Sequence, residues 1–95
     1  MAVKIIIMRT VSPEEYTAIG PYLTKLHALA KQQEGYISGE SLSNIDNPDE
    51  KIVISSWRSK EDWERFISDP EVDAAHQAVD DLIAKKTLHQ IYITG

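Results

Sequence analysis

The sequence has no cysteine, few aromatic residues and no long apolar run. Without cysteine among its 95 residues, the chain has no disulfide bridge and no cysteine-ligated zinc or iron–sulfur site. The longest apolar run near the start, residues 5–8, is far too short for a membrane span or the core of a signal peptide. We therefore expect a protein that stays in the cytoplasm, without a membrane partner.

Positive charge is also scarce. The chain carries 10 Lys and Arg against 15 Asp and Glu, a net charge of -5, and its only adjacent basic pair is Lys85-Lys86. Such a surface repels phosphate backbones, so no nucleic-acid partner is expected. A single domain spanning residues 1–95 buries only about 60–65% of the surface that its unfolded chain exposes, which makes association an obvious further source of stability.

The pattern of β-branched and turn residues predicts four strands. They are expected over residues 2–11, 36–44, 51–58 and 87–94, with helical segments after the first and third strands. The order strand, helix, strand, strand, helix, strand is that of the ferredoxin-like α+β fold, βαββαβ, with a four-stranded antiparallel sheet covered by helices on one face. Right-handed crossovers place the first strand beside the third in the middle of the sheet.

Helix starts are marked by capping residues followed by proline or acidic residues. Ser12-Pro13 begins the first helix, which we expect to kink or split at Gly20-Pro21 and to end at Gly35. Ser59 caps a short second helix, and Asp69-Pro70 restarts helical structure that runs to about residue 86. The inward stripe of that last helix is predicted to comprise Val72, Ala75, Val79, Leu82 and Ile83.

Three of the predicted strands are apolar on both sides, although helices cover only one face of such a sheet. The opposed sets are Val3, Ile5 and Ile7 against Ile6 and Met8 in the first strand, Ile52 and Ile54 against Val53 and Trp57 in the third, and Ile91 and Ile93 against Leu88 and Tyr92 in the fourth. An uncovered apolar face is prone to aggregation, and a second copy laid sheet to sheet removes it by symmetry. The pattern predicts a homodimer formed through the sheet face.

His76 is the residue most suited to chemistry. It lies on the stripe of the last helix, where an imidazole faces the space between helix and sheet. One interpretation is an acid/base or ligand-binding group in a pocket, and the other is a core histidine hydrogen-bonded to a backbone carbonyl. His27 and His89 do not share a metal-binding spacing with it, so no metal site is predicted.

Aromatic side chains near the strand ends and on the short helix are candidates for a substrate pocket. Together they can line a site for a flat organic molecule, although each one alone also suits a core position: Tyr36, Trp57, Trp63 and Phe66. Arg58 follows Trp57 at the strand end and is expected either to hold a substrate oxygen or to pair with Glu61 or Asp62.

Several of these segments resemble the antibiotic biosynthesis monooxygenase (ABM) family. The resemblance is carried by the Gly35-Tyr36 start of the second strand, by Trp57 at the end of the third, by the segment Ser59-Lys60-Glu61-Asp62-Trp63 of the short helix and by the run that ends in His76. It implies a ferredoxin-like fold that dimerises through its sheets into a dimeric α+β barrel. The family includes cofactor-independent monooxygenases of aromatic polyketides, haem-degrading enzymes and enzymes acting on a signalling molecule.

The resemblance leaves three functions open. The first is a cofactor-independent monooxygenase for a small aromatic or quinol-like compound, with His76 as base or hydrogen-bond donor and the aromatic residues around the ring. The second is a haem-binding protein. The haem-degrading branch has an asparagine on strand one and a tryptophan ten residues before the histidine. Here the first position falls at about Met8 and the second is Phe66, so two of the three residues depart from that branch and only His76 matches. The third is a non-catalytic dimer that binds a small ligand.

Overall fold

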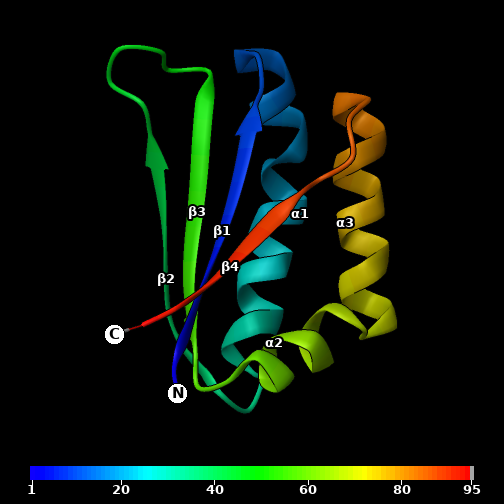
Figure 1. Ribbon diagram of the computed structural model, residues 1–95. Helices are drawn as coiled ribbons and strands as arrows, with labels where there is room; N and C mark the ends of the chain where they lie inside the picture. Colours follow the sequence, from blue (N-terminus) through cyan, green and yellow to red (C-terminus); the bar gives the residue numbers. More distant parts are fainter. Residues whose placement is uncertain (95) are drawn as a thin grey trace.

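The computed structural model describes residues 1–94 (Figure 1). Its elements are β1 (Val3–Thr10), α1 (Pro13–Lys31), β2 (Tyr36–Ser43), β3 (Glu50–Trp57), α2 (Lys60–Ile67), α3 (Pro70–Ile83) and β4 (His89–Ile93). Within residues 1–94, none of the helices combines the length and the apolar composition that crossing a bilayer requires.

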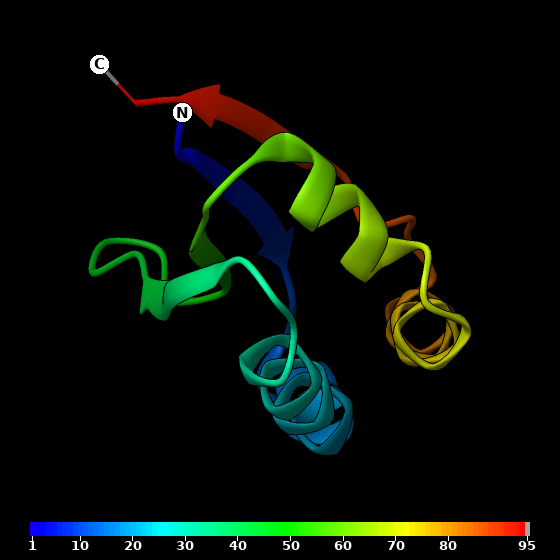
Figure 2. The same cartoon turned by 90° about the horizontal axis from the view of Figure 1, so that it is seen from below.

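The strands form one antiparallel sheet in the order β2-β3-β1-β4, with helices on one of its faces. Ile5 in β1 pairs with Ser55 in β3 and with Ile91 in β4. Figure 2 shows α1 and α3 lying side by side on the same side of the sheet. The ferredoxin-like α+β prediction, with the first and third strands in the middle, is confirmed.

Helix α1 starts where the sequence predicts but does not divide. Ser12 and Glu15 form a capping box, in which Glu15 N donates to Ser12 Oγ at 3.2 Å and Ser12 N donates to Glu15 Oε1 at 2.8 Å. The helix continues through Pro21, so of the two alternatives predicted at this proline, a kink or a split, the split is wrong. A proline inside a helix removes one backbone hydrogen bond, and the burial of Ile19 and Leu26 holds the turns on either side against the core.

Gly35 lies beyond the helix rather than at its end. Helix α1 ends at Lys31, and Gly35 adopts a φ of +91° in the turn that leads into β2. A Cβ atom at this position would lie 2.4 Å from Cγ of Asp62. Glycine is therefore required both by the backbone conformation and by the close approach of α2.

Helix α3 ends at Ile83, earlier than the expected residue 86. Ala84 follows in the left-handed conformation with φ 53°, which ends the helix. The Asp80 carboxylate then accepts a hydrogen bond of 3.0 Å from the backbone N–H of Thr87 in the segment after the helix. Leu82 is 46% exposed and so does not belong to the predicted inward stripe, because it projects from the solvent side of the last turn. Strand β4 is also shorter than predicted.

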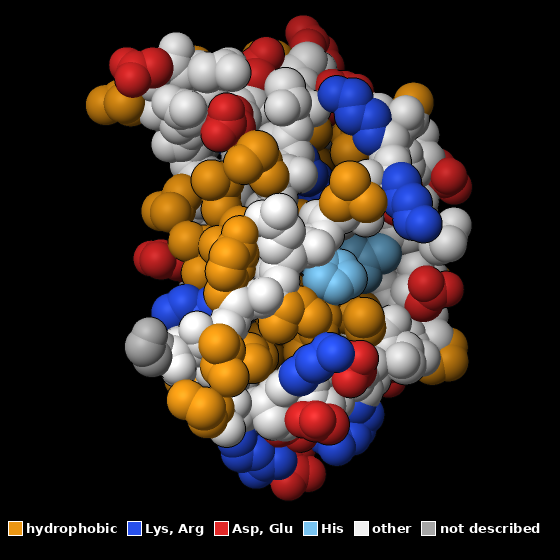
Figure 3. Space-filling view, in the orientation of Figure 1, with side chains coloured by type: hydrophobic (Ala, Val, Ile, Leu, Met, Phe, Trp, Pro, Cys, Tyr) orange, Lys and Arg blue, Asp and Glu red, His pale blue; other side chains and the backbone are white. Residues whose placement is uncertain are grey.

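The two faces of the sheet differ in cover. Val3, Ile5, Ile7 and Trp57 are buried under the helices. The opposite face carries apolar side chains that remain exposed or half-buried: Ile6, Met8, Leu42, Ile52, Ile54 and Tyr92. Figure 3 shows hydrophobic side chains gathered over the strands on this side. The second apolar face predicted from the sequence is therefore present in the fold, on the side of the sheet that the helices leave uncovered.

Candidate functional site

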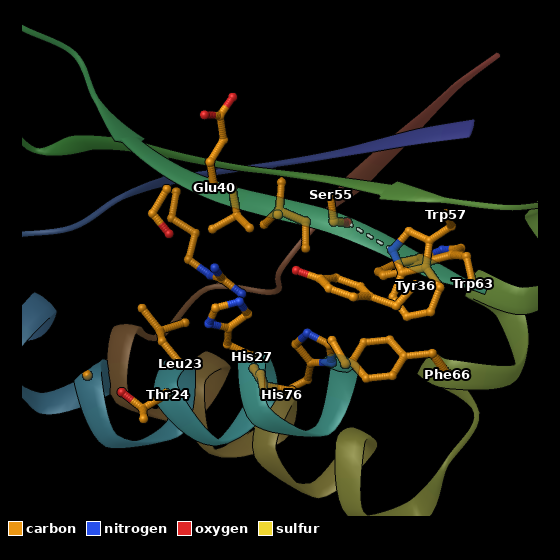
Figure 4. A pocket seen from close by; sticks show the side chains of 18 of the residues that line it. Leu23, Thr24, His27, Tyr36, Glu40, Ser55, Trp57, Trp63, Phe66 and His76 are labelled. Carbon is orange, nitrogen blue, oxygen red and sulfur yellow. Dashed lines mark hydrogen bonds between the residues drawn. The ribbon is translucent and has the colours of Figure 1, made fainter. Parts of the chain in front are cut away.

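A cavity of about 460 Å³ lies between α1 and the covered face of the sheet. Strands β1, β2 and β3 supply one wall, α1 supplies the other, and side chains of α2 and α3 close the remaining sides (Figure 4). Its volume falls within the range of roughly 300–1,000 Å³ typical of sites for small organic ligands.

One end of the cavity is aromatic. The indole of Trp57 is fully buried, and its ring centroid lies 5.0 Å from that of Phe66, 5.8 Å from that of Trp63 and 5.4 Å from that of Tyr36. These four rings come from β2, β3 and α2 and are held edge to face or tilted. The cluster gives the cavity a rigid apolar wall suited to a flat ring system.

The two tryptophans differ in their hydrogen bonding. Trp57 Nε1 donates to Ser55 Oγ at 3.0 Å, which fixes the orientation of the indole. Trp63 Nε1 is buried and finds no acceptor within residues 1–94. Buried N–H groups are nearly always paired, so the unpaired indole N–H at this cavity-lining residue stands out.

The other end of the cavity is polar and carries His76. Asp69 caps α3, with its Oδ1 accepting from the backbone N–H of Glu71 at 2.8 Å, and the helix then buries Val72 and Val79. This register turns the half-buried His76 imidazole into the cavity, where it makes no hydrogen bond with the described residues 1–94 (Figure 4). The alternative of a core histidine bonded to a backbone carbonyl therefore does not match its surroundings.

His76 is kept in its neutral form. Burial lowers the pKa of the imidazole, and the positive charge of Arg9 lowers it further, whereas Asp80 and Asp73 act in the opposite direction. A neutral imidazole at physiological pH has a free nitrogen lone pair and is able to accept a proton from a bound molecule.

Arg9 is a cavity residue that the sequence reasoning missed. It lies on the covered face of β1, two positions beyond Ile7, and only 7% of it is exposed. Its Nη2 donates to Thr87 Oγ1 at 3.4 Å, and its buried Nε has no partner within residues 1–94. Burial lowers the pKa of the guanidinium, and the negative charge of Asp80 only partly opposes this effect.

His27, considered in the sequence only for a metal site, also lines the cavity. Its side chain is exposed, so it lies at the mouth of the cavity, with its ring centroid 6.5 Å from that of Tyr36. Met8, the strand-one position considered for haem, lies on the outer face and is 55% exposed. Strand β1 thus presents Arg9, not Met8, to the cavity.

Arg58 lies outside the cavity lining, unlike the other predicted site residues. The cavity is shared by His76, Tyr36, Trp57, Trp63 and Phe66. Arg58 instead pairs on the surface with Asp62, Nε to Oδ2 at 3.0 Å, and with Glu34 at 3.3 Å. Of the two interpretations of Arg58, the structure favours pairing with Asp62.

The comparisons with known proteins agree with this architecture. A family model described as antibiotic biosynthesis monooxygenase matches residues 2–78. The chain belongs to this family. Among curated protein sequences, none matches this ABM protein.

Solved structures of similar fold span the whole ABM domain. A conserved protein from Methanosarcina mazei is 17% identical, with a TM-score of 0.90 and coverage of 100% of this chain and 94% of that chain. SnoaB from Streptomyces nogalater, described as a cofactor-independent oxygenase, is 17% identical, with a TM-score of 0.81 and coverage of 99% and 93%. Rv0793 from Mycobacterium tuberculosis is 15% identical, with a TM-score of 0.85 and coverage of 100% and 96%. At these identities the likeness establishes the fold alone.

Proposed function

We propose that this ABM protein is a cofactor-independent monooxygenase acting on a small aromatic or quinol-like compound. The observation that carries the proposal is the neutral, half-buried imidazole of His76 facing a cavity whose far wall is built from Trp57, Trp63, Phe66 and Tyr36. Membership of the family and the fold shared with SnoaB support an oxygenase.

In the proposed reaction the substrate itself supplies the electrons that reduce oxygen. An activated methylene is converted to a carbonyl, R₂CH₂ + O₂ → R₂CO + H₂O, so that one oxygen atom enters the product and the other leaves as water. His76 accepts the proton released when the substrate ionises, and the resulting electron-rich anion reacts with oxygen. The aromatic wall holds the ring and keeps bulk water away from the reacting carbon.

The test is oxygen uptake with dithranol, a tricyclic phenol with an oxidisable methylene group. We expect His76→Ala to lower the rate by about 10²–10⁴-fold, the usual contribution of a positioned general base. Gln77→Ala is the matched control, because Gln77 is exposed on the same helix outside the cavity lining. Equal rates for wild type and His76→Ala would remove His76 from the mechanism, and uptake by neither protein would favour a ligand-binding role.

We further propose that the protein is a homodimer through the outer face of the sheet. Met8, Leu42 and Tyr92 are 55%, 46% and 49% exposed on that face, a density of apolar surface typical of an interface. Light scattering at micromolar concentration is expected to give twice the 10.7 kDa chain mass, and Ile54→Lys to give the mass of one chain. A single-chain mass for the wild type would contradict the dimer.

A further inference from the structure

The guanidinium of Arg9 has too few partners for a buried charge. Of its three nitrogens, only Nη2 has a hydrogen-bond partner within residues 1–94, the Thr87 hydroxyl at 3.4 Å, while Nε is buried and unpaired. No carboxylate of the described residues lies within 4.0 Å of it. Buried cations are normally matched by an anion and by a full set of hydrogen bonds, because their hydration is lost.

The acidic residues near the cavity do not supply the missing anion. Asp80 is the carboxylate whose charge acts on Arg9, but its Oδ1 already accepts from both the backbone N–H and the hydroxyl of Thr87. Glu40 belongs to the residues around the cavity, yet Figure 4 shows its carboxylate directed away from the two histidines. The basic groups that line the cavity of this protein, whose net charge is -5, are thus an arginine and two histidines: Arg9, His76 and His27.

The polar groups and the aromatic wall are arranged to hold one molecule between them. Arg9 pairs with Lys51 in the β1–β3 register, whereas Trp57 pairs with Val3, so the cation and the indole enter the cavity from opposite ends of the sheet. Figure 4 shows the Tyr36 hydroxyl pointing from the aromatic end toward His27 and His76. A ligand with a flat apolar ring and a charged oxygen at one end matches this polarity.

We propose that Arg9 is a specificity-determining residue that binds an ionised oxygen of the ligand, and that the ligand is an aromatic acid carrying a carboxylate or an ionised ring oxygen. The inference rests on the proposed function, since it names the class of compound that the same cavity takes. The planar guanidinium is able to engage such a group through two parallel N–H donors, which a lysine ammonium cannot do.

Titration calorimetry with matched ligand pairs tests the inference. Naphthoate and its neutral amide differ in a carboxylate, and lawsone, a hydroxynaphthoquinone ionised near neutral pH, and its methyl ether differ in a ring oxygen. We expect wild type to bind at least one acid about tenfold or more tightly than its neutral partner, the effect of a hydrogen bond to a charged group. The pair that shows the difference in affinity identifies whether Arg9 binds a carboxylate or an ionised ring oxygen.

Arg9→Met is expected to abolish this discrimination while keeping the affinity for the neutral ligands. Arg9→Lys, which keeps the charge without the planar fork, is expected to retain part of it, and it serves as the second variant if Arg9→Met fails to fold. Equal wild-type affinities within both pairs, no binding of either acid by wild type, or discrimination that persists in Arg9→Met would each overturn the inference.

Oxygen uptake and acid discrimination are separate readouts. Discrimination lost with Arg9, in a protein that consumes no oxygen with dithranol, leaves the anion site standing and removes the oxygenase proposal. Oxygen uptake that depends on His76, in a protein that binds acids and neutral ligands equally, supports the oxygenase proposal and removes the anion site.

Discussion

Two buried charges in this protein have opposite surroundings. The carboxylate of Asp62 is 3% exposed and accepts hydrogen bonds from Arg58 at 3.0 Å, from Arg65 at 2.8 Å and from the Ser59 hydroxyl at 2.9 Å. Arg9 is similarly buried at 7% exposure, yet among residues 1–94 its one side-chain partner is a threonine hydroxyl at 3.4 Å. Two surface arginines thus pair with the Asp62 carboxylate, whereas no carboxylate of the part of the chain that the structure describes pairs with Arg9.

The pKa shifts show what the difference means. The hydrogen bond from Arg58 is the main reason that the pKa of Asp62 is lowered to about 2, so its ionised form is favoured in the fold. Burial is the main reason that the pKa of Arg9 is lowered, so its ionised form is disfavoured. The Asp62 network therefore holds α2 against the turn at Gly35. The charge of Arg9 instead lowers the stability of the protein without ligand, and binding of an anionic ligand offsets that loss.

Removing the Asp62 carboxylate should have the largest effect on stability. Asp62→Asn keeps the side-chain volume but loses the charge that attracts both arginines, and we expect the melting temperature to fall by roughly 5–10 °C. In the wild type this contribution should be present above the unfolded pKa of 3.8 and be lost as the pH falls through about 2. Circular dichroism melts measure both effects, and affinity for cavity ligands should not change. An unchanged melting temperature would show that the Asp62 network does not stabilise the fold, and would contradict the contrast drawn with Arg9.

Titration of His76 should give a smaller effect that sharpens the comparison. Its pKa lies below the usual value of 6.5 because of burial and the charge of Arg9, with a further lowering by His89, while the charges of Asp80 and Asp73 act in the opposite direction. Below pH 6.5 the unfolded chain therefore binds more protons than the folded protein, so acidification through this window should lower stability.

Nuclear magnetic resonance of the imidazole nitrogens measures this pKa directly. We expect the midpoint to rise when an aromatic acid binds, because the anion offsets the charge of Arg9. A midpoint at or above 6.5 in the free protein, or one that an acid leaves unmoved, would contradict the description of the polar end of the cavity.

The fold was largely predictable because its sequence patterns are local. Ser12 and Glu15 mark the start of α1, and right-handed crossovers in the βαββαβ order place β1 and β3 in the centre of the sheet. The split at Pro21 was predicted wrongly because the cost of a proline is a local quantity, whereas the packing of Ile19 and Leu26 that offsets it is tertiary.

The aromatic wall of the candidate site and His76 were predictable from the sequence, whereas Arg9 was not. Trp57 and Phe66 follow strand and helix periodicity, so a shared cavity was foreseeable. Arg9 was missed because a charged residue near a strand end is usually solvated, although its odd-numbered position puts it on the same face as Ile5 and Ile7. For Arg58 both a ligand contact and a pair with Glu61 or Asp62 were predicted, and the sequence could not decide between them because Asp62, at the start of α2, looks like an exposed residue.

The contrast between Asp62, which stabilises the fold, and Arg9, which is assigned to ligand binding, is tested most directly by the thermal stability of Arg9→Met in the absence of ligand. An uncompensated buried charge costs the fold free energy, so replacing it with an apolar side chain of similar length should leave the melting temperature unchanged or raise it, in opposition to Asp62→Asn. A melting temperature that falls as far as that of Asp62→Asn would show that Arg9 holds the fold together, and would contradict its assignment to ligand binding.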